Sequence, residues 1–144
     1  VPCNCGRNGC WESYASATAL IAQTKAKMKE CPDSKMWELC DGDINRVSGR
    51  TAFNAMYAGD EAGKEVVDRY RYYVAVGIIN IVNIFQPEVI CVGGGISNEG
   101  DNLLDPIREF VAKERYSKYA KKQTKICKAV LGNDAGIIGA ALLG

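Results

Sequence analysis

Three cysteines, Cys3, Cys5 and Cys10, stand close together near the start of the sequence, in the run C-N-C-G-R-N-G-C. Thiolates are ligands of Zn²⁺, and the glycines at positions 6 and 9 let the loop fold back so that three sulfur atoms can converge on one tetrahedral ion. A closed structural site needs a fourth ligand, and the sequence contains no histidine. The spacing also differs from that of a zinc knuckle. We expect a metal-binding loop here, and the alternative is three incidental cysteines in a reduced loop.

A carboxylate, Glu12, follows the third cysteine by two residues. A carboxylate can accept hydrogen bonds from two hydroxyl groups of a ligand, and an adjacent metal loop would fix its position. The alternative is a glutamate placed at the start of a helix because the helix dipole favours negative charge there.

A second candidate site is the glycine run Gly93, Gly94 and Gly95, which follows the β-branched segment 88–92. A strand that ends in consecutive glycines lets the backbone approach a ligand closely and presents N–H groups to an anion. The run does not complete the pattern G-x-G-x-x-G, because Asn98 stands where the third glycine would be. Nicotinamide dinucleotide binding is therefore not predicted, and an ordinary glycine-rich turn is the alternative.

The run C-N-C-G-R-N-G-C-W-E resembles the signature C-x-C-G-x-x-G-C-x-E of the ROK family (repressors, open reading frames, kinases), and in particular its glucokinase-like sugar kinases. In that family the three cysteines bind a structural zinc together with an earlier histidine. The resemblance implies that Cys3, Cys5 and Cys10 are zinc ligands and that the histidine would precede Val1. It also implies that Glu12 contacts sugar hydroxyls.

The glycine run resembles the adenosine motif of the actin–hexokinase–Hsp70 superfamily, which implies that Gly93, Gly94 and Gly95 bind ATP. The segments 77–88 and 131–141 are also similar to ROK kinases, so the resemblance covers nearly the whole sequence. It implies an α/β fold, namely part of the C-terminal domain of the actin/hexokinase-like (ribonuclease H-like) ATPase fold, helix-rich and with few strands.

The resemblance implies a reaction for the intact protein: transfer of the γ-phosphoryl group of ATP to the 6-hydroxyl of glucose, with Mg²⁺ on the phosphates. ROK kinases carry a D-x-G-G-T phosphate loop and an N-D general base in their N-terminal domain, and neither occurs in that position here. We expect no catalytic residue in this chain, with the general base upstream of Val1, and no activity of the chain alone. The alternatives are a sugar-sensing repressor of the same family, a kinase for fructose or N-acetylmannosamine, and a module for dimerisation.

Hydrophobic spacing and turn residues predict the elements that position these sites. Helices are expected at 11–30, 51–58, 60–85, from Asp105-Pro106 to 116, and at 135–143, with strands at 88–92 and 124–131. The second half of the long helix, 74–85, is apolar nearly all round, so we expect it to lie under other elements, with Asn80 and Asn83 as satisfied core amides. Two strands alone make no stable sheet, and the remaining ones are expected upstream.

The predicted organisation is one partial domain over 1–144. It consists of a zinc loop (1–12), a helical region (13–86), an adenosine-binding strand and loop (88–97) and C-terminal helices with a strand (100–144). The sequence begins Val-Pro without methionine, and we expect a fragment or a processed product.

Composition limits the classes of partner. Eighteen basic and seventeen acidic residues argue against a nucleic-acid-binding arm and against binding to an anionic membrane.

An odd number of cysteines, seven, argues against a disulfide framework and indicates the reducing cytoplasm. Cys91 and Cys127 lie in apolar runs, where we expect buried free thiols. The expected partners are glucose or a related hexose and ATP, in a homo-oligomer, most simply a dimer, that serves glycolysis.

Overall fold

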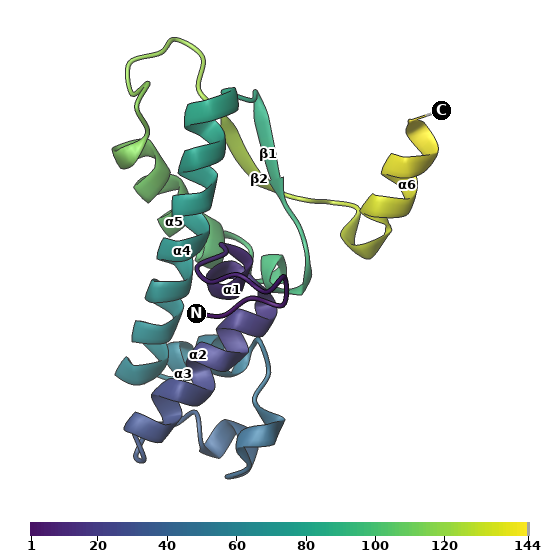
Figure 1. The fold of residues 1–144 in the computed structure, drawn as a ribbon. Coiled ribbons are helices and arrows are strands. Elements are labelled where there is room, and N and C mark those ends of the chain that lie inside the picture. Colours follow the sequence, from purple (N-terminus) through teal and green to yellow (C-terminus); the bar gives the residue numbers. More distant parts are fainter. Residues whose placement is uncertain (144) are drawn as a thin grey trace. The chain divides into compact units, whose positions relative to one another are not determined.

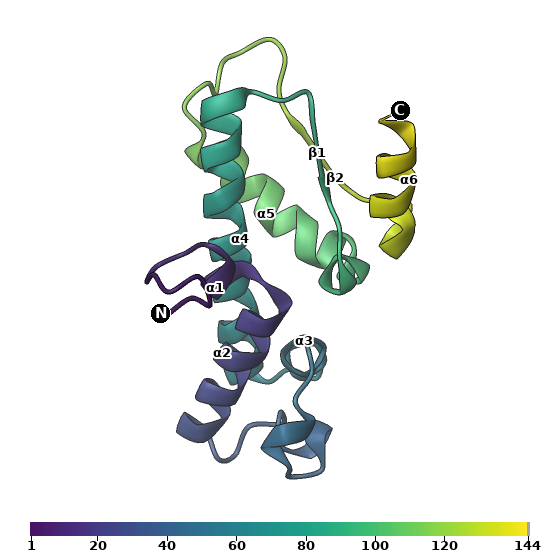
Figure 2. The same ribbon diagram turned by 45° about the vertical axis from the view of Figure 1, so that its right-hand side comes forward.

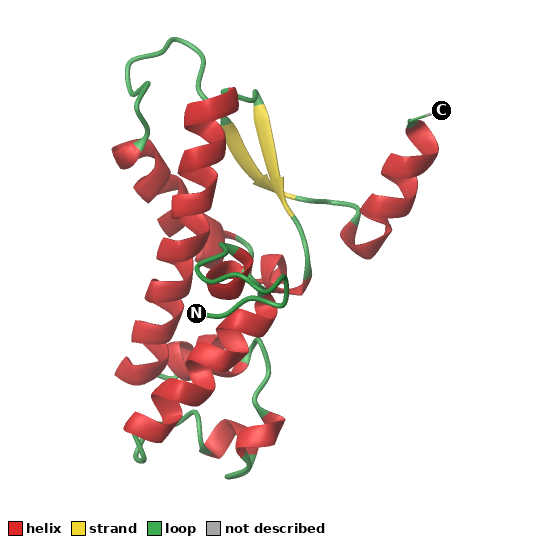
Figure 3. Ribbon diagram, viewed as in Figure 1, coloured by secondary structure: helices red, strands yellow, loops and turns green. Residues whose placement is uncertain are grey.

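The computed structural model describes residues 1–143, which form a helix-rich α/β chain with two short strands (Figure 1, Figure 3). In chain order the elements are α1 (Glu12–Ala15), α2 (Ala17–Glu30), α3 (Thr51–Tyr57), α4 (Glu61–Phe85), β1 (Val89–Val92), α5 (Asp101–Glu114), β2 (Lys125–Lys128) and α6 (Ala135–Leu142), with short 3₁₀ turns between them. The chain divides into two compact units, residues 1–77 and 78–144, and the boundary falls inside α4. Of the predicted C-terminal segment, Gly144 lies outside the described residues.

The first unit is a helical body with its own core. In α2, Leu20, Thr24 and Met28 are fully buried and stand four residues apart, so they share one face of the helix. The buried hydroxyl of Thr24 donates to the backbone oxygen of Leu20 at 2.8 Å, so its burial leaves no unpaired donor. Phe53 of α3 and Val67 of α4 complete this core.

Ser16 interrupts the single helix that was predicted for residues 11–30. Its backbone is extended (ψ 165°), and its side chain accepts a hydrogen bond from the backbone N–H of Ala19 at 3.1 Å. Serine in this role caps the start of a new helix. The prediction of one helix was therefore wrong: the four-residue α1 is separate from α2, and the cysteine-containing loop leads into α1 alone.

The long helix α4 begins where the sequence predicted. Gly59 has φ 79°, a left-handed conformation that favours glycine, and it ends α3. The Asp60 carboxylate accepts hydrogen bonds from the N–H groups of Gly63 at 2.7 Å and Lys35 at 2.6 Å. One side chain thus caps α4 and anchors the segment between α2 and α3.

The second unit contains the sheet (Figure 2). Strands β1 and β2 pair in parallel, from Val89 opposite Lys125 to Val92 opposite Lys128, and α5 makes the crossover between them. The inward face of the strand pair includes the buried Ile126. The prediction of a helix-rich fold with few strands is confirmed.

Helix α5 starts earlier than predicted. We expected Asp105 and Pro106 to begin it, but it begins at Asp101 and carries Pro106 inside. A proline inside a helix costs about 3 kcal/mol because it removes a backbone donor and crowds the preceding turn. The added turn buries Leu103 and Leu104 almost completely, and burial contributes about 1.5–3 kcal/mol for each side chain. That gain outweighs the cost.

The last turns of α4 are not enclosed as predicted. Ile78 and Val82 are buried, but Ile84 and Phe85 are 72% and 73% exposed. Asn80 and Asn83 are also exposed, so the prediction of core amides was wrong. Asn83 instead accepts a hydrogen bond from the backbone N–H of Tyr116 at 3.0 Å. Ile78 and Val82 are four residues apart and so share one face of the helix, and in these last turns this is the face that residues 1–143 cover.

Among residues 1–143, none of the helices combines the length and the apolar character that crossing a bilayer requires.

Candidate metal loop and ligand-binding residues

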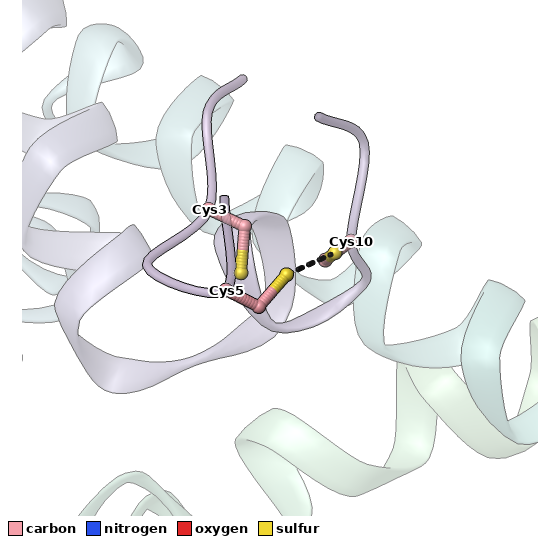
Figure 4. A group of neighbouring side chains, drawn as sticks. All are labelled: Cys3, Cys5 and Cys10. Carbon is pink, nitrogen blue, oxygen red and sulfur yellow. Dashed lines mark hydrogen bonds between the residues drawn. The ribbon is translucent and has the colours of Figure 1, made fainter. Parts of the chain in front are cut away.

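The three cysteines of the N-terminal loop converge. Their sulfur atoms all lie within 4.8 Å of one another, and the sulfurs of Cys5 and Cys10 are 3.5 Å apart. Figure 4 shows the side chains of Cys3, Cys5 and Cys10 pointing toward one another. The loop folds back and brings the three sulfur atoms together, as the glycine spacing predicted.

Backbone hydrogen bonds hold the loop in this shape. The N–H of Cys3 donates to the oxygen of Arg7 at 2.8 Å, and that of Gly6 donates to the oxygen of Cys3 at 2.9 Å. Gly6 and Gly9 have φ values of 82° and 80°. Both values lie in the left-handed region where a side chain is unfavourable, so glycine is needed at each turn of the loop.

The electrostatics of the loop suit a cation. A hydrogen bond from the Arg7 backbone, aided by the other thiols, lowers the pKa of Cys5 to about 7. The hydrogen bond shared with Cys5 raises the pKa of Cys10 to about 11. The Cys5 thiol therefore ionises easily. The Cys10 thiol keeps its proton, because a second negative charge beside the first is unfavourable. A metal ion between the sulfurs would replace that proton.

The residues present fit a zinc ion in part. Three thiolates supply three of the four ligands of a tetrahedral structural site. In the described part of the chain, no other acidic residue or cysteine joins the group. The ligand set is thus open at one position.

Trp11 fixes the end of the loop, and sequence reasoning did not single it out. Its indole N–H donates to the backbone oxygen of Tyr73 in α4 at 2.7 Å. Its ring lies over Gly77, where a Cβ atom would come within 2.0 Å of the ring. Tyr14 packs on Tyr73 with ring centroids 5.0 Å apart. Two features of the sequence could have indicated this contact: a tryptophan directly after the third cysteine, and a glycine in an otherwise apolar stretch of helix.

Glu12 is the first residue of α1 and is exposed. It lines a pocket of about 220 Å³ whose wall includes polar side chains of the loop, of α1, of the turn after it and of α2: Asn4, Ser13, Ser16 and Thr18. Within residues 1–143 its carboxylate has no hydrogen-bond partner. A four-residue helix offers only a small dipole to a carboxylate at its start.

The glycine run continues β1 in the second unit. Gly93, Gly94 and Gly95 are all exposed, and Gly94 has φ 87°. The hydroxyl of the buried Ser97 donates to the oxygen of Gly94 at 2.7 Å and holds the turn. The exposed backbone of this run has the form expected for close approach of a ligand.

Cys91 was expected to be a buried thiol, and that expectation was wrong. It is exposed, because residues alternate between the faces of a strand and only the face that includes Ile126 is covered. Its partner Cys127 is half-buried.

Comparison with known proteins gives consistent results over the whole chain. The chain is 37% identical to the glucokinase of Halalkalibacterium halodurans over 148 aligned residues, which cover 99% of this chain and 43% of that protein. It is 25% identical to the xylose repressor of Bacillus subtilis over 95% of this chain and 31% of that protein.

Among solved structures, the ROK family glucokinase from Streptomyces griseus in complex with glucose and AMPPNP matches with a TM-score of 0.87 and 31% identity. The match covers 100% of this chain and 47% of that one. The chain thus spans less than half the length of these relatives. Its fold is that of ROK sugar kinases, which confirms the predicted fold class. The sequence model of the ROK family matches residues 1–144, and the chain belongs to the ROK family.

Proposed function

We propose that the protein to which this chain contributes phosphorylates glucose at its 6-hydroxyl, with ATP as phosphoryl donor and Mg²⁺ on the phosphates. The observation that carries the proposal is the match of the whole chain, at a TM-score of 0.87, to a glucokinase whose structure was solved with glucose and AMPPNP. The glucokinase from Halalkalibacterium halodurans supports the same assignment.

In this proposal Glu12 binds the sugar. Its carboxylate is exposed, free of protein partners and placed at a pocket with hydroxyl and amide groups. A hydrogen bond between a charged acceptor and a hydroxyl contributes about 1.5–3 kcal/mol. Two such bonds from one carboxylate would orient the sugar as well as bind it.

Cys3, Cys5 and Cys10 would hold a zinc ion with a structural role. The ion would supply no chemistry to the reaction beyond fixing the loop. The loop leads directly into Trp11 and Glu12, and Trp11 is attached to α4. The metal loop and the tryptophan would therefore together fix the backbone that leads into Glu12.

Gly93, Gly94 and Gly95 would lie against the nucleotide. The general base and the loop that binds the phosphates would come from a part of the protein outside this chain, which spans less than half the length of its relatives. In-line phosphoryl transfer depends on positioning of nucleophile and phosphate, so the chain alone would be inactive.

The free thiols are those of a cytoplasmic protein.

A sugar-responsive repressor is the second candidate, because the xylose repressor of Bacillus subtilis matches 95% of this chain. In that case Glu12 and its pocket would bind a sugar without phosphorylating it. The two candidates differ in whether ATP is consumed.

The test joins this chain to the N-terminal half of its own protein and measures ADP formation with glucose, fructose, xylose and N-acetylmannosamine. We expect sugar-dependent ADP formation that is fastest with glucose. Sugar binding without ADP formation, together with sugar-dependent release from DNA, would replace the kinase by the repressor.

A further inference from the structure

Two thiols face each other across the strand pair of the second unit. Cys91 of β1 and Cys127 of β2 are register partners in the parallel ladder, and their sulfur atoms are 3.5 Å apart. Register partners project from the same face of the sheet. The two sulfurs are therefore neighbours because of the fold, although 36 positions separate them in the chain.

The pair is accessible, and one exposed lysine lies on the same face of the strand pair. Cys91 is exposed and Cys127 is half-buried. Lys125, two positions before Cys127, shares its face of the strand and is exposed. An exposed ammonium group on this face attracts an anionic reagent.

The spacing permits a covalent bond. Neighbouring strands lie about 4.7–4.9 Å apart, and disulfides occur at Cα separations of about 4.4–6.8 Å. The strand spacing falls within that range, so a bond can form between the two sulfurs without a large movement of the backbone. Exchange with a free thiol would reverse it.

We propose that Cys91 and Cys127 form a modification site at which a small anionic disulfide of the glutathione type oxidises the pair to an intrachain disulfide. A thiolate of the pair attacks one sulfur of glutathione disulfide, forming a mixed disulfide and releasing one glutathione thiolate. The second cysteine sulfur, as thiolate, then attacks the mixed disulfide and releases the second glutathione thiolate. Two cysteine thiols are oxidised, two electrons reduce the reagent, and the two cysteine protons leave with the released thiolates.

The proximity of the sulfurs determines the product. Hydrogen bonding by Cys127 raises the pKa of Cys91, so attack through the Cys91 thiolate is slow at neutral pH. The second attack takes place between groups already in contact and is therefore fast. The mixed disulfide should not accumulate. This proposal is independent of the proposed function, although the disulfide would tie β1 to β2 directly before the glycine run.

The experiment treats the reduced full chain with glutathione disulfide, blocks free thiols and maps tryptic peptides without reduction. Cys91 is the one cysteine in the peptide 72–108, and Cys127 is the one cysteine in the peptide 126–128. We expect these two peptides to be joined, with a mass two hydrogen atoms below their sum, and to separate on reduction. Cys127→Ser should leave glutathione attached to Cys91, whereas the control Cys31→Ser should leave the joined peptides unchanged.

The same reaction in urea tests the proposal without a sequence variant. Unfolding separates the two sulfurs, so the yield of joined peptides should fall severalfold. An equal yield in urea, or glutathione attached separately to both cysteines of the folded chain, would overturn the proposal. An unreacted pair under conditions that oxidise the N-terminal cysteines would overturn it as well.

Discussion

The indole nitrogen of Trp11 lies 2.7 Å from the backbone oxygen of Tyr73, one helical turn before Gly77. This contact joins the end of the metal loop to the middle of the longest helix, and the ring occupies the space that a side chain at position 77 would fill.

The first prediction concerns Gly77→Ala. A Cβ atom would come within 2.0 Å of the Trp11 ring, and inserting a methyl group into a packed contact typically costs about 1–3 kcal/mol. We expect a loss of that size in the free energy of unfolding, measured by urea denaturation. The control is Gly139→Ala in α6, which meets no atom within 4 Å and should be neutral or slightly stabilising. Equal effects of the two substitutions would mean that Trp11 does not occupy this space.

The second prediction concerns Glu12→Gln in the protein that includes the N-terminal half. Loss of a charged acceptor for a hydroxyl costs about 1.5–3 kcal/mol. The KM for the sugar should therefore rise about tenfold to hundredfold, and the KM for ATP should change little. Glu61→Gln, at the exposed start of α4, is the matched control. An unchanged sugar KM in the Glu12 variant would leave this residue with a helix-end role only.

The third prediction concerns metal content. A protein with all four ligands should hold about one zinc per chain, and the chain with three thiolates should hold less zinc or release it readily to a chelator. Cys3→Ser and Cys10→Ser should each lower the zinc content, whereas Cys40→Ser, at a buried position remote in sequence, should not. Elemental analysis makes the measurement. Stoichiometric, chelator-resistant zinc in the 144-residue chain would contradict the need for a further ligand.

The fourth prediction concerns pH. Burial disfavours ionisation of Asp60, but the N–H groups of Gly63 and Lys35 outweigh it and lower its pKa below the ordinary value. A lowered pKa in the folded state means that the stabilisation is present above the unfolded pKa, about 3.9, and is lost as the pH falls below it toward the folded pKa. Asp60→Asn keeps one acceptor oxygen for two donors, so it should cost about 1 kcal/mol at pH 7.

The cost of Asp60→Asn should shrink as the pH falls below 4, because the native carboxyl then loses its charge too. Urea denaturation of both proteins across the pH range measures the difference. A constant difference at all pH values would show that ionised Asp60 has no special role in the fold.

The fifth prediction concerns association. Within residues 1–143, each strand of the pair has one edge without a partner strand, and open edges recruit other chains. Ile84 and Phe85 add exposed apolar surface at the end of α4. We expect the 144-residue chain to self-associate in light scattering and to show no glucose phosphorylation in a coupled assay. A monodisperse monomer would contradict the expected self-association. Measurable phosphorylation would contradict the expected lack of activity.

The features that depend on local chemistry could be predicted from the sequence. The convergence of the three cysteines needed only cysteines and glycines within ten positions, and the start of α4 needed only Gly59 and Asp60. The features that depend on tertiary burial could not. Pro106 argues for a helix start when its neighbours are considered alone, and only the burial of Leu103 and Leu104 shows that the helix begins earlier. The exposure of Asn80 and Cys91 likewise depends on which face the rest of the chain covers.

The pairing of β1 with β2 also has a kinetic consequence. Residues paired across the two strands are 36 positions apart. The intervening segment must therefore lose much of its conformational entropy before any hydrogen bond between the strands forms to offset that loss. Helices such as α4 form from contacts within a few residues and are not delayed in this way. The strand pair should therefore form late as the second unit folds, and the orientation of the glycine run at the end of β1 becomes fixed only when that step is complete.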